Sequence, residues 1–248
     1  MEKDLYNFLA KDYHKKRSKP WKDLETFVEE IKEKEISFTG YNIDLGCANG
    51  RNFSVFIQPN NRLIGVDNSF EFLKIARDHL KSDNNLPKYS SNFIQLILSD
   101  ILFLPIRPNV IQNIFSIATI HHIKDKTQLN YAISQFNSLL RNKGYFLFTV
   151  WRKYQKNYRS YFIKDKIKRL FNPKYRRIQN NLGLNEYGDK FVPWTLSAEK
   201  KTYKRFYHFF SNKEIKKLLK EYIILELKKM GGPNKKDNFF ILAQKVIK

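Results

Sequence analysis

The sequence is poor in cysteine and in acidic residues, and each shortage excludes a class of protein. Its 248 residues include one cysteine, Cys47, which excludes a disulfide framework and a zinc site built only from cysteines, and which favours a reducing compartment. Only 24 Asp and Glu residues stand against 46 Lys and Arg, so the formal charge is +22 at pH 7. Such an excess of cations indicates a polyanionic partner rather than a neutral metabolite.

The sequence also lacks a long uncharged run. Its longest stretch without Asp, Glu, Lys or Arg is Pro108–Ile123, which is too short to cross a bilayer. The first residues, Met1 to Asp4, lack the apolar run of a secretory signal, and their acids argue against a mitochondrial leader. We therefore expect a cytoplasmic protein with no membrane partner. With 42% hydrophobic residues, the chain is apolar enough to fold.

The positive charge is concentrated beyond residue 150. Residues 1–150 hold 20 Lys and Arg against 16 Asp and Glu, whereas residues 151–248 hold 26 against 8. The segment Arg152–Arg177 contains eleven Lys and Arg, four Tyr and a single acid, Asp165. We predict a basic, partly helical insertion there, with cations that neutralise phosphates and tyrosines that stack on exposed bases. A cationic tract of this kind selects polyanions in general and does not identify a particular one.

Short apolar runs alternate with amphipathic helical patterns, and this alternation predicts a parallel sheet with right-handed crossovers. The predicted strands are Tyr41–Leu45, Arg62–Val66, Phe93–Leu98, Asn113–Ala118 and Tyr145–Val150. The predicted helices are Trp21–Glu35, Phe70–Leu80, Thr127–Leu140 and Asn212–Glu221. A closing pair of strands is predicted at Tyr222–Leu227 and Asn238–Val246. We expect one domain, made of a covering segment (1–36), a core (37–151), a basic insertion (152–204) and closing strands (205–248).

Three of the predicted strands end at an acidic residue. The first carries Asp44 and leads into a turn with Gly46 and Gly50, the second is followed by Asp67, and the third by Asp100. Glycines let the backbone turn tightly beside a ligand, and carboxylates suit ribose hydroxyls and the exocyclic amine of adenine. Because ligands of such sheets bind at the carboxyl ends of the strands, the pattern predicts an adenosine-containing ligand. The alternatives are a glycine turn without a ligand and acids that only cap the following helices.

These residues resemble the class I S-adenosylmethionine-dependent methyltransferases, in which a glycine loop, a ribose acid and an adenine acid stand at the same places. The departure is Ala48, where many members carry a third glycine. The spacing Gly-x-Gly-x-x-Gly of dinucleotide dehydrogenases is absent. The resemblance implies a Rossmann-like, mostly parallel seven-stranded sheet with helices on both faces, S-adenosylmethionine as cofactor and no metal. The cofactor residues that it implies are Asp44, Gly46, Cys47, Gly50, Asp67, Asn68, Asp100, Ile101 and Ile117.

Five further motifs resemble those of the eukaryotic tRNA wobble-uridine methyltransferases, which esterify 5-carboxymethyluridine. In chain order they are Arg17-Ser18-Lys19-Pro20-Trp21, the loop Ser116–His122, Val192-Pro193-Trp194, the run Arg205–Phe209, and Asp237-Asn238-Phe239. The resemblance covers nearly the whole chain except the basic insertion, which aligns with nothing in the family. It implies a carboxyl methyltransferase acting on tRNA, in a heterodimer with a small zinc-binding activator subunit.

The substrate implied by this resemblance is already charged, because a carboxymethyl group has a pKa near ~4. No general base is required, and the site must orient and partly desolvate the carboxylate. We expect Arg17 to hold it bidentately, the alternative being a solvated cation in a basic turn. His121 and His122 are expected to position the substrate or close the site, and loop packing is the alternative for one of them. The predicted catalytic residues are Arg17, His121, His122, Arg205, Tyr207 and His208.

Some aromatic residues near these motifs are predicted to be structural. We expect Phe206 and Phe209 to lie in the core. Trp21 and Trp194 suit stacking on a base, but packing within the protein is favoured for both.

The third predicted strand, Phe93–Leu98, is apolar on both faces. In the usual methyltransferase strand order it lies at the edge of the sheet, where exposed apolar surface is a liability. We therefore expect the activator subunit to dock along this edge and its neighbouring helix. The alternative is that the chain's own helices cover it.

Two other functions stay open on the sequence alone. One is a methyltransferase that acts on another RNA position or on a small carboxylic acid, and the other is an inactive, methyltransferase-like RNA-binding scaffold. The intact cofactor residues disfavour the scaffold, and the C-terminal charge disfavours the small-molecule enzyme.

Overall fold

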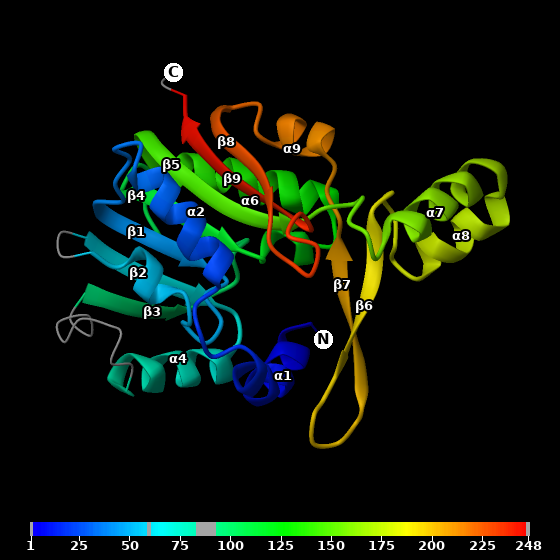
Figure 1. Ribbon diagram of the computed structural model, residues 1–248, viewed down its shortest axis with the longest axis horizontal. Helices are drawn as coiled ribbons and strands as arrows, with labels where there is room; N and C mark the ends of the chain where they lie inside the picture. The colour runs from blue at the N-terminus through cyan, green and yellow to red at the C-terminus, as the bar shows by residue number, and fades with distance from the viewer. Residues whose placement is uncertain (1, 59–60, 83–92, 247–248) are drawn as a thin grey trace.

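A seven-stranded sheet forms the centre of the protein, in the order β3-β2-β1-β4-β5-β9-β8 (Figure 1). The computed structural model describes residues 2–58, 61–82 and 93–246. The strands of the sheet are β1 (Gly40–Leu45), β2 (Asn61–Asp67), β3 (Ile94–Leu98), β4 (Ile111–Ile117), β5 (Leu140–Trp151), β8 (Tyr222–Met230) and β9 (Asn238–Lys245). The predicted fold class and each predicted strand are confirmed, with small shifts at the ends.

Strands β1 to β5 run parallel, and β9 enters antiparallel between β5 and β8. The chain starts the sheet at β1, builds outward to β3, and then returns to place β4 on the other side of β1. The loops that follow β1 and β4 therefore run to opposite faces of the sheet. Such sheets bind ligands in the crevice between these two loops, outside the carboxyl ends of the strands. The third strand lies at the edge, as predicted.

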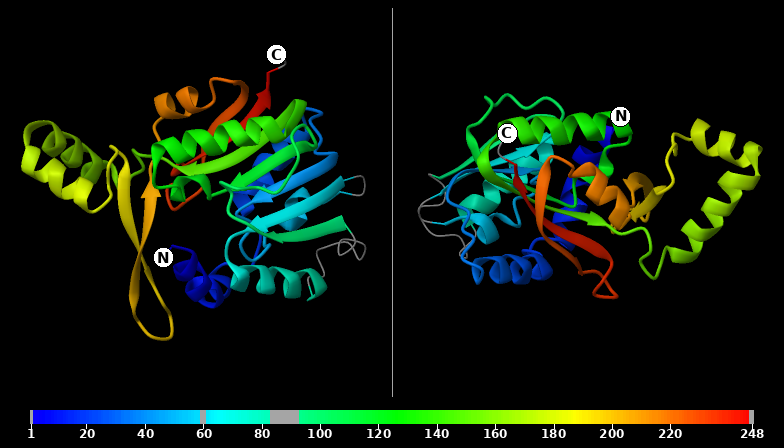
Figure 2. Two further views of the ribbon diagram at one scale, coloured as in Figure 1. Left: turned by 180° about the vertical axis from the view of Figure 1, so that it is seen from behind. Right: turned by 90° about the horizontal axis from the view of Figure 1, so that it is seen from above.

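Helices cover both faces of the sheet (Figures 1 and 2). Helices α6 (Lys126–Leu139) and α9 (Asn212–Leu218) pack their buried apolar side chains against one face. Helices α2 (Lys22–Lys32), α3 (Phe53–Phe56) and α4 (Phe70–Ser82) pack against the other. Helix α2 buries Leu24, Phe27, Val28 and Ile31, the apolar stripe that predicts it from the sequence. No helix among the described residues is long and apolar enough to cross a membrane.

The sequence patterns missed helix α1 (Glu2–Lys16), the short helix α3, and a separate hairpin of β6 (Asp189–Thr195) and β7 (Thr202–His208). Helix α1 and the hairpin matter most for the site. They lie beside one another below the end of the sheet in Figure 1. The Asp12 carboxylate joins them, because it accepts hydrogen bonds from Trp194 Nε1 at 2.8 Å and from the Ser197 N–H at 2.8 Å. Lys16 Nζ also donates to the Thr195 carbonyl at 2.6 Å.

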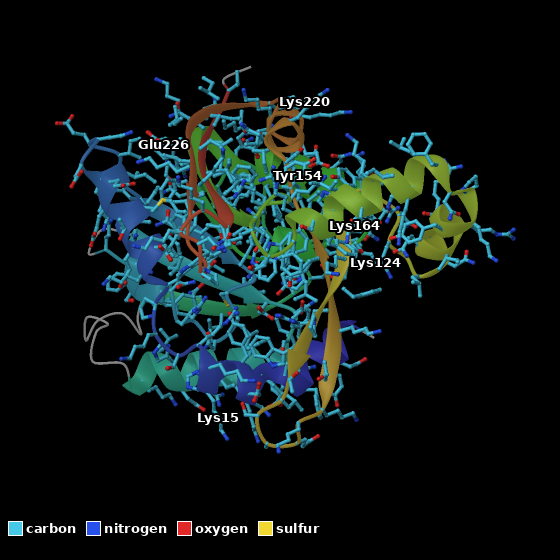
Figure 3. All side chains as sticks on the ribbon, turned by 45° about the vertical axis from the view of Figure 1, so that its right-hand side comes forward. Lys15, Lys124, Tyr154, Lys164, Lys220 and Glu226 are labelled. Carbon is cyan, nitrogen blue, oxygen red and sulfur yellow. The ribbon has the colours of Figure 1, made fainter. Side chains whose placement is uncertain are left out.

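The basic insertion forms an arm of two helices, α7 (Arg159–Phe171) and α8 (Pro173–Asn181). The insertion is thus partly helical, as predicted. Figures 1 and 2 show the arm projecting from the sheet beyond the hairpin. Its single acid, Asp165, is buried and bound by Arg169 Nε at 2.8 Å and by the Tyr175 hydroxyl at 2.9 Å. The exposed surface of the arm therefore carries cations without an acid. Figure 3 shows Lys164 on the arm and Lys124 close to the hairpin.

Candidate active site

A cavity of about 420 Å³ lies at the carboxyl ends of β1, β2 and β4, where the strand order reverses. Its volume falls in the range of small-molecule pockets, roughly 300–1,000 Å³. Helix α1 and strand β7 supply its outer walls. The predicted site residues that line it are Arg17, Gly46, Asp67, Asn68, Asp100, Ile101, Ile117, His121, His122, Arg205 and Tyr207. The fold thus brings residues from six separate segments of the chain to one cavity.

The turn after β1 requires glycine because of contacts within the protein. Gly46 has a φ of +75°, and a Cβ atom there would overlap the side chain of Thr119. Gly50 has a φ of +71°, and a Cβ atom there would lie 2.5 Å from the ring of Phe53. Cys47 is buried in the core, and neither Cys47 nor Gly50 is among the residues that line the cavity. These two residues therefore act on a ligand only through the shape of the turn.

Asp67 ends β2 at the cavity and fixes the facing turn. Its Oδ2 accepts the Ala48 N–H at 2.9 Å, and its Oδ1 accepts the Ser69 N–H at 2.9 Å. Burial raises the pKa of Asp67 to about 6, although these backbone hydrogen bonds oppose the rise. Each carboxylate oxygen has two lone pairs, so both retain capacity to accept from ligand hydroxyls.

Asp44 lies behind the cavity with an unsatisfied oxygen atom. The residue is 2% exposed, and its Oδ1 has no hydrogen-bond partner among the described residues. Burial, followed by the charge of Asp67, raises the pKa of Asp44 to about 7. Two buried carboxylates without a cationic side chain bonded to them fit a ligand that brings positive charge. S-adenosylmethionine carries a sulfonium and an ammonium group, so this donor set fits the cofactor.

The loop after β3 forms another wall of the part of the cavity that carries the predicted cofactor residues (the cofactor half). Asp100 Oδ1 accepts the Leu102 N–H at 2.9 Å, which fixes the turn. Ile101 and Ile117 add apolar surface, and Phe103 also lines the cavity although it is 71% exposed. An apolar wall with a carboxylate at its edge suits a purine ring, which is the ligand predicted for Asp100.

Both histidines of the loop after β4 line the cavity, because they lie on a 3-10 turn, η1 (Ile120–His122), rather than on extended chain. Neither of them packs away from the site. Burial lowers the pKa of His121 well below 6.5 and that of His122 to about 3, so both are neutral at pH 7. His121 Nδ1 accepts the Trp151 N–H at 3.4 Å, which leaves its proton on Nε2, an atom without a partner among the described residues. His122 donates from Nδ1 to the Phe206 carbonyl at 2.8 Å.

Arg17 and Arg205 both pack against the ring of Trp194, on the side of the cavity that carries the predicted catalytic residues (the substrate half). The guanidinium carbon of Arg205 lies 4.5 Å from the ring centroid, and that of Arg17 lies 5.3 Å from it. Arg205 is 6% exposed, and its Nε has no partner among the described residues. Neither guanidinium forms an ion pair with a carboxylate of the described chain. Two unpaired guanidinium groups in one cavity create a site for an anion.

Aromatic rings hold these guanidinium groups in place. Tyr13 stacks on Trp194 with ring centroids 5.7 Å apart and lies 5.4 Å from the guanidinium carbon of Arg17. Tyr207 lies 5.1 Å from that of Arg205 and stacks on His121 at 4.8 Å. Trp194 is packed, as predicted, and its packing also orients both cations.

His208 does not reach this cavity. Side chains alternate along a strand, so Arg205 and Tyr207 face the cavity while His208 faces the opposite side of β7. It lines a second cavity of about 370 Å³ between α6 and α9. The prediction that places His208 among the catalytic residues with Arg205 and Tyr207 therefore overlooked the alternation of side chains along the strand.

Sequence reasoning also missed the side chains that α1 contributes. Tyr6 and Tyr13 line the cavity, and Asn7 Oδ1 accepts a hydrogen bond from the Ser69 hydroxyl at 2.8 Å. The available signal was the spacing of Tyr6, Leu9 and Tyr13, at i, i+3 and i+7 of a helix.

The strand order, the acids of β1 and β2, and the cavity at the reversal point are those of the class I S-adenosylmethionine-dependent methyltransferase fold. A family model described as a methyltransferase domain matches residues 43–148. A methyltransferase from Methanosarcina mazei aligns with a TM-score of 0.68 at 17% identity, over 88% of this chain and 98% of that one. Another, from Clostridium acetobutylicum, aligns with a TM-score of 0.63 at 17% identity, over 98% and 100%.

Relatives in sequence narrow the class further. A Schizosaccharomyces pombe protein named tRNA (carboxymethyluridine(34)-5-O)-methyltransferase is 29% identical over 264 residues, covering 97% of this chain and 94% of that protein. A Saccharomyces cerevisiae protein of the same name is 27% identical, over 79% of this chain and 57% of its own length. A Mus musculus relative is 27% identical and matches over 22% of its own length. These relatives confirm the predicted resemblance to the wobble-uridine methyltransferases.

Proposed function

We propose that this methyltransferase forms the methyl ester of 5-carboxymethyluridine at the wobble position of tRNA. The observation that carries the proposal is the pair of guanidinium groups, Arg17 and Arg205, that share a cavity with the cofactor residues and bind no described carboxylate. They make the cavity selective for an anionic acceptor. The names of the relatives in two yeasts support the same reaction.

An anionic acceptor needs orientation rather than deprotonation. A carboxylate with a pKa near ~4 is ionised at neutral pH and is already a nucleophile. When bound, S-adenosylmethionine supplies the methyl group, which passes from sulfur to a carboxylate oxygen without movement of a proton. Arg205, held by Trp194 and Tyr207, fixes the carboxylate in the buried part of the cavity, and Arg17 closes on it from the exposed side.

The two histidines take supporting parts in this scheme. Because both are neutral at pH 7, the charge of the carboxylate is balanced by the arginines alone. The unpartnered Nε2–H of His121 donates a hydrogen bond to an oxygen of the substrate. Neither imidazole acts as a general base.

We place the tRNA across the cavity and the basic arm. The arm offers exposed Lys168, Lys174, Arg176 and Arg177 to phosphates, whereas Arg169 is occupied by Asp165. Its tyrosines are mostly engaged within the protein, as in the hydrogen bond from Tyr175 to Asp165. Phosphate contacts, rather than base stacking, are therefore the arm's contribution.

We also propose a protein partner and a compartment. Strand β3 pairs with β2 alone among the described strands, and Leu98 at its end is half exposed. A small zinc-binding activator subunit, of the kind that the resembled family uses, covers this edge. A cytoplasmic location fits the tRNA substrate and the single reduced cysteine. Co-expression of the activator with wild type and with Leu98→Asp tests the interface, and equal recovery of both complexes contradicts it.

The reaction is tested with tRNA that bears 5-carboxymethyluridine and with cofactor that carries a radiolabelled methyl group. We expect label in the wobble nucleoside, and brief mild alkali should release it as methanol because the product is an ester. Mass spectrometry of the nucleosides identifies the position. Label that resists alkali contradicts a carboxyl acceptor, and label released from a small carboxylic acid instead of tRNA contradicts the RNA substrate.

A further inference from the structure

Four side chains, two cationic or titratable and two acidic, form a largely buried cluster behind the wall that carries Arg205 and Tyr207. They are Lys153 after β5, Asp189 on β6, His208 on β7 and Glu214 on α9. Lys153 Nζ lies 2.9 and 3.0 Å from the two oxygens of Glu214. His208 Nδ1 lies 2.7 Å from Asp189 Oδ1, and its Nε2 lies 3.7 Å from Glu214 Oε1. Lys153 and Asp189 are each 1% exposed, whereas the side chain of Glu214 is 37% exposed, so the cluster reaches from the interior to the second cavity.

His208 is the member that joins the two halves of this cluster. Lys153 also donates to the Tyr187 carbonyl at 2.6 Å, and Glu214 Oε2 also accepts the Ser211 N–H at 2.6 Å. Asp189 Oδ2 is held by the Glu186 N–H at 2.7 Å. Asp189 and Glu214 are thus each anchored within their own segments, and Lys153 joins α9 to the segment before β6. His208 adds the link between the two carboxylates, because its ring nitrogens point to Asp189 on β6 and to Glu214 on α9.

The charge on the imidazole decides whether the cluster is balanced. With His208 protonated, two positive groups face two carboxylates, but with His208 neutral the cluster keeps one uncompensated negative charge beside the buried Asp189. Burial alone lowers the pKa of His208, but hydrogen bonds and charge from Asp189 and Glu214 outweigh it and raise the pKa above 6.5. The pKa of Glu214 is about 2, since its bonds with His208 and Lys153 outweigh its own burial.

Other charged groups also line the cavity onto which His208 opens. They come from the loop before α6, from α6 itself, from the segment before β6, and from α9 and its end, and they are Lys124, Lys126, Glu186, Lys217, Lys220 and Glu221. Four cations against two acids favour neutral imidazole, yet solvent screens these more exposed groups. The two carboxylates in contact with the ring therefore dominate.

The cluster lies directly opposite the substrate wall along the same strand. Tyr207, next in the chain, stacks on His121, and the Phe206 carbonyl accepts the hydrogen bond from His122. Arg205 lies two residues before Tyr207 on the same face. The position of the end of β7 therefore determines where Arg205, Tyr207 and His122 lie.

We propose that His208 is a positioning residue, whose imidazolium ties β6 and β7 to α9 and so holds Arg205 and Tyr207 in the active-site cavity. The effect on turnover rests on the proposed function, whereas the effect on the hairpin does not. The contribution is complete below pH 6.5 and is lost as the pH rises through the raised pKa of His208.

Kinetics of wild type, His208→Gln and Lys204→Gln test the effect on turnover between pH 6 and pH 9. Lys204 is an exposed residue of the same strand, so its variant is a matched loss of one positive charge. For wild type we expect kcat/KM for tRNA to fall on the alkaline side, and for His208→Gln to be about ten- to a hundredfold lower at pH 6 and to lack this fall. Affinity for S-adenosylhomocysteine, measured by calorimetry, should change less than twofold in all three proteins. A His208→Gln profile that parallels wild type overturns the proposal.

Hydrogen–deuterium exchange provides a readout that needs no activity. Protection of residues 189–208, corrected for intrinsic rates and compared with helix α6, should decrease in wild type as the pH rises. In His208→Gln it should already be low at pH 6, and in Lys204→Gln it should follow wild type. Hairpin protection in wild type that does not depend on pH contradicts the proposal even where His208→Gln fails to fold. If tRNA is not methylated but the exchange pattern holds, the proposed function fails while the positioning role stands.

Discussion

At the scale of single residues, the two arginines of the cavity differ in their surroundings. Arg205 is almost fully buried and lies over Trp194 and beside Tyr207, whereas Arg17 is exposed. A charge-assisted hydrogen bond is stronger where water is excluded. The bound carboxylate therefore depends more on Arg205, although the sequence alone favoured Arg17 for this role.

The first prediction follows from this difference. Arg205→Lys keeps the charge but removes the bidentate fork, and we expect kcat/KM for tRNA to fall about tenfold to a hundredfold. Arg17→Lys should cost less than tenfold. Steady-state assays at pH 7 check both, with Lys204→Gln as control. A larger loss at Arg17 than at Arg205 would reverse the assignment.

The second prediction concerns Asp67. In Asp67→Asn, one amide N–H must face a backbone N–H of Ala48 or Ser69, and the negative charge beside the cofactor is lost. We expect binding of S-adenosylmethionine to weaken by about 1.5–3 kcal/mol. Calorimetry measures this, and Asp78→Asn, at an exposed acid of α4, is the control. Unchanged affinity in a folded Asp67→Asn protein removes Asp67 from the site.

The third prediction is a pH dependence of cofactor binding. The pKa is about 7 for Asp44 and about 6 for Asp67, so both become protonated as the pH falls through this range. The cationic cofactor binds the ionised carboxylates, and its affinity should therefore fall from pH 8 to pH 5 and binding should release protons. Calorimetry in two buffers of different ionisation enthalpy counts these protons. A pH-independent affinity would mean that neither Asp44, behind the cavity, nor Asp67, in its wall, titrates in response to the cofactor.

At the scale of elements, regular strands and amphipathic helices were predictable, whereas α1 and the β6–β7 hairpin were not. The strands of the sheet are buried apolar runs, and the local pattern suffices to find them. Strand β6 contains Pro193, which argues against a strand. Both hairpin strands also carry charged residues, of which Asp189 and Arg205 are buried, so they lack the apolar pattern that identifies the strands of the sheet. The acids that end β1, β2 and β3 were predictable in the same local way.

The substrate half of the site was less predictable because its contacts are long-range. Tyr13, Trp194 and Arg205 come from three distant parts of the chain, and no periodicity relates them. Motifs placed Trp194 and Arg205 near the site but did not show that they meet. For His208, in contrast, the alternation of side chains along a strand was enough to separate it from Tyr207.

The fourth prediction tests the junction between α1 and the hairpin. Asp12 binds Trp194, Ser197 and Lys16, and these hydrogen bonds outweigh burial and hold the pKa of Asp12 well below its usual range. Asp12→Asn should weaken the junction, so protease should cleave the N-terminal segment several-fold faster. Lys11→Gln, at an exposed position of α1, should leave the cleavage rate unchanged. Equal rates for all three proteins would mean that other contacts hold α1.

At the scale of the whole molecule, the excess of positive charge is concentrated where the tRNA is proposed to lie. The arm carries exposed cations, and its only acid is buried and paired. The charge imbalance was visible in the sequence, but the pairing of Arg169 with Asp165 was not. A count of cations therefore overstates the number that can bind phosphate.

The fifth prediction uses the salt dependence of tRNA binding. A combined change of Lys168, Lys174, Arg176 and Arg177 to Gln should reduce the slope of log K against log[salt] by about 0.7–0.9 for each phosphate that the arm no longer neutralises. Four exposed lysines of α9 and its end serve as a control with the same change in net charge, and they are Lys213, Lys216, Lys217 and Lys220. Fluorescence anisotropy with labelled tRNA at several salt concentrations measures the slopes. An equal reduction in both variants contradicts an RNA surface on the arm.

Helix α1 also connects the two halves of the cavity. It contacts the cofactor half through the hydrogen bond from Ser69 to Asn7, and it leads into Arg17, which belongs to the substrate half. The same helix is joined to the hairpin through Asp12. A displacement of α1 would therefore disturb both halves of the cavity at once, so the two binding sites are mechanically coupled through one helix.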